Sequence, residues 1–115
     1  MNYTIEHQGK NVIFTLKQKS VTSEISAQLK AQLLIICQPD IDALILDLSN
    51  VEMIDSSGLG AFLLAHRQLK EHAIPIALVG VNPMVASLLR ISQIDNLFDV
   101  FDTVDSAIET FAEEQ

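Results

Sequence analysis

The sequence has few aromatic residues: it contains no Trp, one Tyr and five Phe among 115 residues. Because 49% of the chain is hydrophobic all the same, its core must be built mainly from Leu, Ile, Val and Ala. A chain of this length forms one domain with a modest core, and aliphatic cores of this kind suit helices packed on a sheet. We therefore expect residues 1–115 to form a single α/β domain.

Basic residues are also scarce, since seven Lys and Arg stand against 15 Asp and Glu, a formal net charge of −8. Proteins that bind the phosphate backbone cluster Lys and Arg on one surface, so we expect no nucleic acid partner. The simplest interpretation of the acidic charge is solubility, and a preference for a basic protein surface is the alternative.

The sequence lacks long apolar runs and a basic-then-apolar leader. Uninterrupted apolar stretches such as Leu33–Cys37 fall far short of the roughly 20 residues that cross a membrane. We expect a cytoplasmic protein that does not insert into membranes.

Residues that bind metals or form disulfides are few and scattered. Cys37 is the single cysteine, so it forms no internal disulfide, and its apolar neighbours predict a buried thiol. His7, His66 and His72 follow none of the spacings typical of metal ligands. We expect neither a metal nor another cofactor.

Hydrophobic periodicity alternates between strand and helix along the chain. Short buried strands that alternate with amphipathic helices are typical of parallel βαβ units. Taken together, the pattern of elements predicts a mixed sheet of four to five strands with about four helices packed largely on one side. The expected elements are a β-hairpin over 2–17, a helix from Thr22 or Ser23 to about Cys37, strands over 41–49, 74–80 and 97–101, and helices from about Gly58 to Lys70, after Asn82 and after Thr103.

The stretch VEMIDSSGLGAF joins the buried strand over 41–49 to the next helix. It places Asp55, Ser56 and Ser57 in a loop at the carboxyl end of that strand, where function collects in open α/β sheets. The first interpretation is that Ser56 or Ser57 caps the helix. A second hydroxyl is then surplus, and Gly58 and Gly60 suggest that another chain or an anion such as phosphate approaches the helix start.

Catalytic interpretations of this stretch find little support. The stretch does not form a G-x-S-x-G pattern around Ser56, because Ile54 takes the place of the first glycine, and no histidine lies where a base is needed. The glycines do not follow a P-loop or a Rossmann pattern, and the acidic pair and Lys of an aspartyl-phosphate receiver are absent. We do not expect an enzyme.

The stretch LILDLSNVEMIDSSGLGAFLLAHRQLK resembles the signature of the STAS-domain family of anti-sigma factor antagonists, and the element order resembles that family over essentially the whole chain. In this family the first serine after the aspartate, here Ser56, is phosphorylated by a GHKL-type kinase that is also an anti-sigma factor. The resemblance implies a partner switch. The unphosphorylated antagonist binds the kinase, which frees the sigma factor. The phosphorylated antagonist dissociates from the kinase, and a PP2C-type phosphatase then removes the phosphate. The implied partner-binding residues are Thr22, Asp55, Ser56, Ser57, Gly58, Leu59 and Gly60.

The turn after the second strand departs from the family pattern. Well-known antagonists carry a Gly-acidic-Leu-Asp-like turn there, bordering the kinase-binding face, whereas this chain has KQKSVTSE with Lys17, Lys19, Ser20 and Thr22. The fold is also similar to the small cytoplasmic subunit of lipid-trafficking ABC transporters and to scaffold subunits of stress-sensing assemblies. Neither of these alternative roles requires phosphate turnover.

Overall fold

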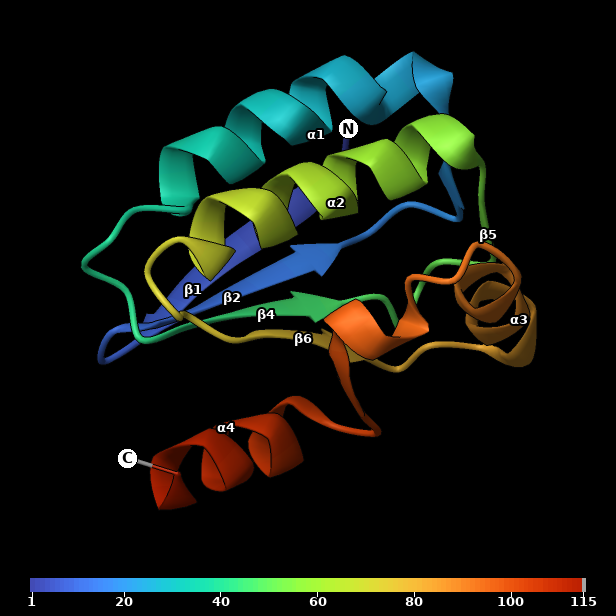
Figure 1. Ribbon diagram of the computed structural model, residues 1–115. Helices are drawn as coiled ribbons and strands as arrows, with labels where there is room; N and C mark the ends of the chain where they lie inside the picture. The colour runs from blue at the N-terminus through green and yellow to red at the C-terminus, as the bar shows by residue number, and fades with distance from the viewer. Residues whose placement is uncertain (115) are drawn as a thin grey trace.

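A mixed five-stranded sheet lies between two layers of helices (Figure 1), as the computed structural model of residues 1–114 shows. The strand order is β1-β2-β4-β6-β7, with β1 antiparallel to β2 and every other neighbouring pair parallel. This arrangement confirms the predicted α/β fold and its hairpin. The strands are β1 (Tyr3–Gln8), β2 (Asn11–Leu16), β4 (Ala43–Asp47), β6 (Ile76–Val79) and β7 (Asp99–Phe101).

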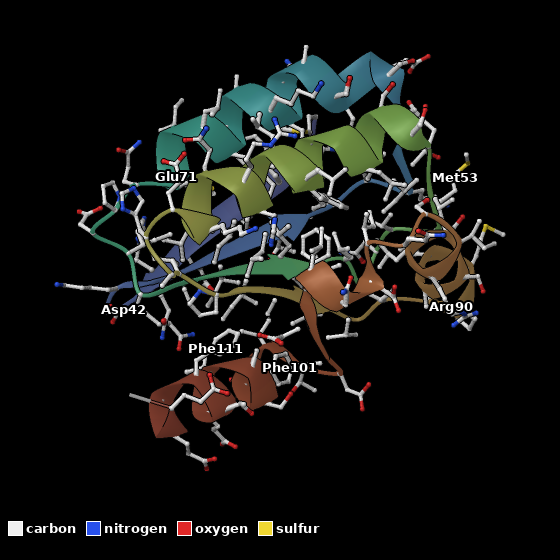
Figure 2. All side chains as sticks on the ribbon, viewed as in Figure 1. Asp42, Met53, Glu71, Arg90, Phe101 and Phe111 are labelled. Atoms are coloured by element: carbon white, nitrogen blue, oxygen red, sulfur yellow. The ribbon has the colours of Figure 1, made fainter. Side chains whose placement is uncertain are left out.

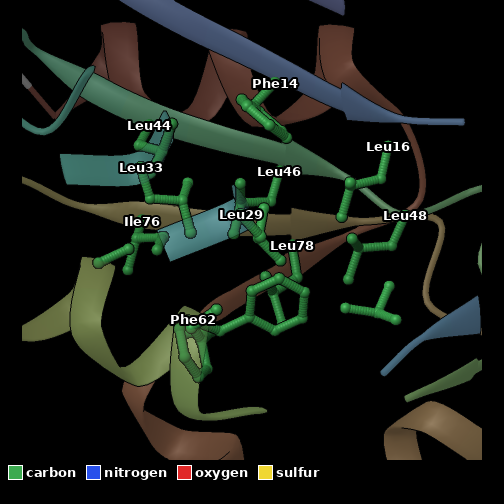
Figure 3. Close-up of a cluster of buried hydrophobic side chains, with 14 of the residues drawn as sticks. Phe14, Leu16, Leu29, Leu33, Leu44, Leu46, Leu48, Phe62, Ile76 and Leu78 are labelled. Carbon is green, nitrogen blue, oxygen red and sulfur yellow. The ribbon is translucent and has the colours of Figure 1, made fainter. Parts of the chain in front are cut away.

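The central strand β4 is covered on both faces, which explains why its sequence is a continuous apolar run. Leu44 and Leu46 point to the larger core (Figure 3), which α1, α2 and α3 close. Ala43 and Ile45 point to the smaller core on the other face of the sheet, which α4 covers. All four side chains are completely buried.

Three helices, α1 (Ser23–Ile36), α2 (Ser56–Lys70) and α3 (Pro83–Ile91), pack on the larger core, and α4 (Val104–Glu113) covers the opposite face. The helices therefore lie largely on one side, as predicted. Figure 2 shows Phe101 of β7 and Phe111 of α4 next to each other, and their rings meet edge to face with centroids 5.6 Å apart. Within residues 1–114, no helix has both the length and the apolar character needed to span a bilayer.

Predicted caps and buried groups are confirmed at several positions. Thr22, Asn82 and Thr103 each accept a hydrogen bond from a backbone N–H in the first turn of the helix that follows. Cys37 is 7% exposed. Burial raises the pKa of its thiol to about 11, so it stays protonated and behaves as a small apolar side chain.

Three short elements were not predicted. Strands β3 (Ser20–Val21) and β5 (Met53–Ile54) form a small parallel sheet of their own, and the 3-10 turn η1 (Asp95–Leu97) delays β7 by two residues. Strands of two residues show no periodicity, and this pair joins segments more than 30 residues apart in sequence. Only the tertiary structure brings them together.

The completely buried side chain of Leu46 predicts a large effect of truncation. We expect Leu46→Ala to lower the free energy of unfolding by about 2–5 kcal/mol, because it removes apolar contacts and leaves a cavity. The matched control is Leu34→Ala on α1, a side chain that is 45% exposed and should change stability far less. Urea unfolding of both variants measures the difference, and equal losses would contradict the placement of β4 at the centre.

Candidate functional site

The segment that follows β4 is held in place from two sides. Asp47 accepts hydrogen bonds from the backbone N–H and the hydroxyl of Ser49, which shapes the turn. Further along, the side-chain amide of Asn82 donates to the carbonyl oxygens of Val51 and Glu52, at 3.2 and 3.1 Å. Since Asn82 also caps α3, the beginning of that helix is tied directly to the segment leading into β5.

Strand β5 is tied on its other side to the segment that precedes α1. The Lys19 carbonyl accepts hydrogen bonds from the N–H groups of Glu52 and Met53, and the Val21 carbonyl accepts one from Asp55. These bonds place the amino ends of α1 and α2 side by side, at the end of the molecule where α3 also begins (Figure 1).

Asp55 holds the starts of two helices with one carboxylate. Its Oδ1 accepts a hydrogen bond from the Gly58 N–H of α2 at 3.0 Å. Its Oδ2 accepts one from the Ser23 N–H, the first residue of α1, at 3.2 Å. A carboxylate at this point satisfies free amides of both helices and lies favourably at the positive ends of two helix dipoles.

The two serines do not cap the helix, so the expectation that Ser56 or Ser57 is the cap was wrong. Asp55 occupies the cap position, and both serines belong to the first turn of α2 instead of a loop. The backbone of Asp55 is extended, and its Oδ1 accepts the capping hydrogen bond from the Gly58 N–H of α2. Its Oδ2 binds the start of α1 at the same time. Ser56 is exposed, Ser57 is half-buried, and neither hydroxyl forms a hydrogen bond within residues 1–114.

Gly58 is needed for a close approach within the chain itself. A Cβ atom there would lie 2.6 Å from the Val21 carbonyl oxygen and 2.8 Å from the Ile54 side chain. The interpretation that this glycine makes room for another chain or an anion was therefore wrong: strand β3 fills that space. At Gly60 a Cβ would meet nothing nearer than the Lys30 side chain at 4.0 Å.

The structure brings the predicted partner-binding residues together, but they differ in how much surface they offer. Ser56 is exposed, Asp55 and Thr22 are half-buried at adjacent helix caps, and Gly58 and Leu59 are buried. His66 lies on the same helix but roughly 15 Å further along its axis, too far to act as a base for Ser56. In residues 1–114 no three His, Cys, Asp or Glu side chains gather as a metal site.

Two exposed methionines near this helix start were not predicted as part of the site. Met53 of β5 is 44% exposed and Met84 in the first turn of α3 is 66% exposed. Figure 2 shows Met53 at the end of the molecule opposite Glu71, where α3 lies against β5. A helical projection of 83–91 would have found Met84, because it lies outside the buried stripe of Val85 and Leu89.

The fold and the helix start agree with a known family, whose STAS domain model matches residues 2–107. The chain belongs to the STAS domain family. This assignment confirms the resemblance carried by the stretch around Asp55 and Ser56.

Solved structures with the same fold include several anti-sigma factor antagonists. An anti-sigma-factor antagonist (STAS) domain protein from Planctomyces limnophilus has a TM-score of 0.87 at 18% identity, with 95% of this chain and 96% of that chain covered. The anti-sigma factor antagonist SpoIIAA in its unphosphorylated form has a TM-score of 0.83 at 19% identity, with 97% of each chain covered.

The same fold is found in two further structures. The Bacillus cell fate determinant SpoIIAA in its phosphorylated form has a TM-score of 0.74 at 20% identity, with 95% of this chain and 98% of that chain covered. A sulfate transporter family protein from Wolinella succinogenes has a TM-score of 0.78 at 20% identity, with 90% and 86% covered. At these identities the similarity establishes a shared fold.

The two glycines of this STAS domain's helix start should respond in opposite ways to alanine. We expect Gly58→Ala to destabilise the fold by about 1–3 kcal/mol, because its Cβ overlaps the backbone of β3. Gly60→Ala should stabilise it by up to about 1 kcal/mol, because alanine is the better helix former and the space is open. Urea unfolding compares them, and a Gly58→Ala variant as stable as wild type would rule out the close approach of Val21.

Proposed function

We propose that this STAS domain is a cytoplasmic, phosphorylation-controlled anti-sigma factor antagonist and that Ser56 is its switch. The observation that carries the proposal is the division of roles at the start of α2. Asp55 caps α2, and the adjacent Ser56 hydroxyl is exposed and forms no hydrogen bond within residues 1–114. A kinase can therefore reach and modify Ser56 without dismantling the fold.

The electrostatics of the site suit reversible phosphorylation. A phosphoserine carries about −1.5 to −2 charges, and Asp55 beside it repels that charge. The positive ends of the α1 and α2 dipoles, which meet at this point, offset part of the repulsion. Phosphorylation should consequently change the surface sharply and the stability little.

The surroundings of Ser56 also explain why a phosphate would end a complex. The exposed Met53 and Met84 give this end of the molecule an adaptable apolar surface that a partner protein can cover. A doubly charged group placed next to such a contact must be desolvated without a matching cation. A coupling of about 1–3 kcal/mol between modification and binding changes affinity about 5- to 150-fold.

The proposed cycle uses two partner enzymes. In a GHKL-type anti-sigma kinase, the Ser56 hydroxyl oxygen attacks the γ-phosphorus of ATP, ADP leaves, and the hydroxyl proton passes to a base of the kinase. A PP2C-type phosphatase hydrolyses the ester with water, which restores the serine and releases inorganic phosphate. The domain itself contributes the acceptor and the binding surface, and we assign it no catalytic activity. That SpoIIAA, which shares the fold, exists in unphosphorylated and phosphorylated forms supports this cycle.

A constitutive structural role is the second candidate function. The fold also occurs in a sulfate transporter family protein, so this fold is not confined to antagonists. A permanent subunit of a lipid-trafficking ABC transporter or of a stress-signalling scaffold would need the surface around α2 but not the turnover of phosphate.

Variants of the two serines separate these functions. We expect Ser56→Ala to fold normally and to bind the anti-sigma kinase permanently, because the cap at Asp55 is untouched. Ser56→Asp should fold and bind at least about fivefold more weakly, because its carboxylate supplies part of the phosphate charge. Ser57→Ala is the matched control and should still be phosphorylated at Ser56.

The measurements are intact mass after incubation with the kinase and ATP, and affinity for the kinase by titration calorimetry. The kinase is identified by pull-down from the native cytosol with wild type and Ser56→Asp. Phosphate on Ser57, or equal affinities of the Ala and Asp variants at Ser56, would favour the constitutive subunit.

A further inference from the structure

A polar cleft of about 630 Å³ opens at the carboxyl ends of β2 and β4. Two of its lining residues are cationic, Lys17 and Lys19, which follow β2 directly. The remaining lining residues are Ser49, Asn50 and Glu52, from the turn after β4. In a chain with a net charge of −8, this cleft holds two of the seven basic residues within a stretch of three.

The backbone that carries the two lysines is fixed on both flanks. The Lys17 N–H donates to the Asn2 carbonyl at 2.9 Å, and the Lys19 carbonyl accepts from Glu52 and Met53. Between them, the Gln18 side chain points elsewhere, where it accepts a hydrogen bond from the Asn2 N–H at 2.7 Å. Lys17 and Lys19, on either side of Gln18, both line the same cleft.

The ammonium groups of Lys17 and Lys19 are available to an external ligand. Neither lysine forms an ion pair within 4.0 Å with a carboxylate of residues 1–114, although Glu52 lines the same cleft. With two lysines and one glutamate among its lining residues, the cleft is locally positive on an acidic molecule. The complementary ligand is an anion, and the Asn50 side-chain amide adds neutral hydrogen-bonding groups to the same wall.

We propose that the cleft receives an acidic segment of the partner protein, in which carboxylates bind Lys17 and Lys19. Two lysines line the cleft, so a ligand with several negative groups, such as a segment rich in Asp and Glu, suits it better than a ligand with one. A single small anion such as phosphate is a poorer match, because it occupies one point in a wide polar cleft. The kind of partner is thus a protein with an acidic, not a basic, contact strip.

The cleft is connected to the helix start through β5. Lys19 is hydrogen-bonded through its carbonyl to Met53, and β5 leads from there to Asp55 and Ser56. This inference rests on the proposed function in one respect, because it assigns the acidic segment to the kinase that modifies Ser56. Charges at the rim of an interface act mainly on the association rate and its dependence on salt.

The first test uses hexaglutamate as the probe and needs no knowledge of the partner. The ¹⁵N-labelled chain is titrated at low salt, and we expect amide shifts at 17–19 and 49–52 that disappear in Lys17→Glu/Lys19→Glu. The matched control, Lys10→Glu/Lys70→Glu, changes the same charge in the β1–β2 turn and at the end of α2 and should keep the shifts. Shifts that spread to Lys10 and Lys70 instead, or equal shifts with inorganic phosphate, would overturn the proposal.

The second test uses the purified kinase that phosphorylates Ser56. We expect Lys17→Glu/Lys19→Glu to weaken binding about tenfold or more and to flatten its dependence on salt, with the control within about twofold of wild type. Unchanged affinity and salt dependence would refute an acidic contact. Intact mass keeps the two proposals apart: absence of phosphate on Ser56 counts against the switch, and the hexaglutamate titration still decides the cleft.

Discussion

The two hydrogen bonds of the Asp55 carboxylate are the constraint on which the rest of the site depends. One oxygen holds the start of α2 and the other holds the start of α1, so a single side chain joins the starts of the two helices that cover the larger core. The Val21 carbonyl supports the same junction through the Asp55 N–H. Gly58 is required because strand β3 lies so close to it.

In the proposed switch, this constraint assigns structure and signalling to neighbouring residues. Asp55 is committed to the fold, and Ser56 is left exposed at a point where two helix dipoles converge. Under our proposal, a phosphate is added at this point, where the fold tolerates its charge and the partner does not. The proposed acidic contact at Lys17 and Lys19 is connected to this point through β5, so that charge would govern both the choice of partner and its release.

Much of this architecture could be predicted from the sequence, because its signals are local. Leu44, Ile45 and Leu46 belong to a continuous apolar run that is too short for a typical helix and typical of a strand buried on both faces, and Asn82 followed by Pro83 marks a helix start. These features need only the residue itself and its neighbours in the chain.

Most predictions that failed concern contacts between distant segments. Nothing near Gly58 in the sequence shows that Val21 will lie against it, and two-residue strands such as β3 and β5 have no periodicity to detect. The serine cap is a different kind of miss, because Asp55 caps α2 through the nearby Gly58 N–H and Asp is as good a cap residue as Ser. Only the second bond of Asp55, to the Ser23 N–H more than 30 residues earlier, depends on a distant segment. The exposure of Met53 likewise depends on where α3 packs.

The central claim is that phosphorylation of Ser56 alters a surface and leaves the Asp55 junction intact. The most direct measurement is the comparison of backbone amide NMR spectra of the unphosphorylated chain and of the chain phosphorylated at Ser56. We predict chemical-shift changes confined to the first turns of α1 and α2 and to β5, with the core strands β4 and β6 unchanged. Changes that extend through β4 and β6, or loss of the folded spectrum, would contradict the account.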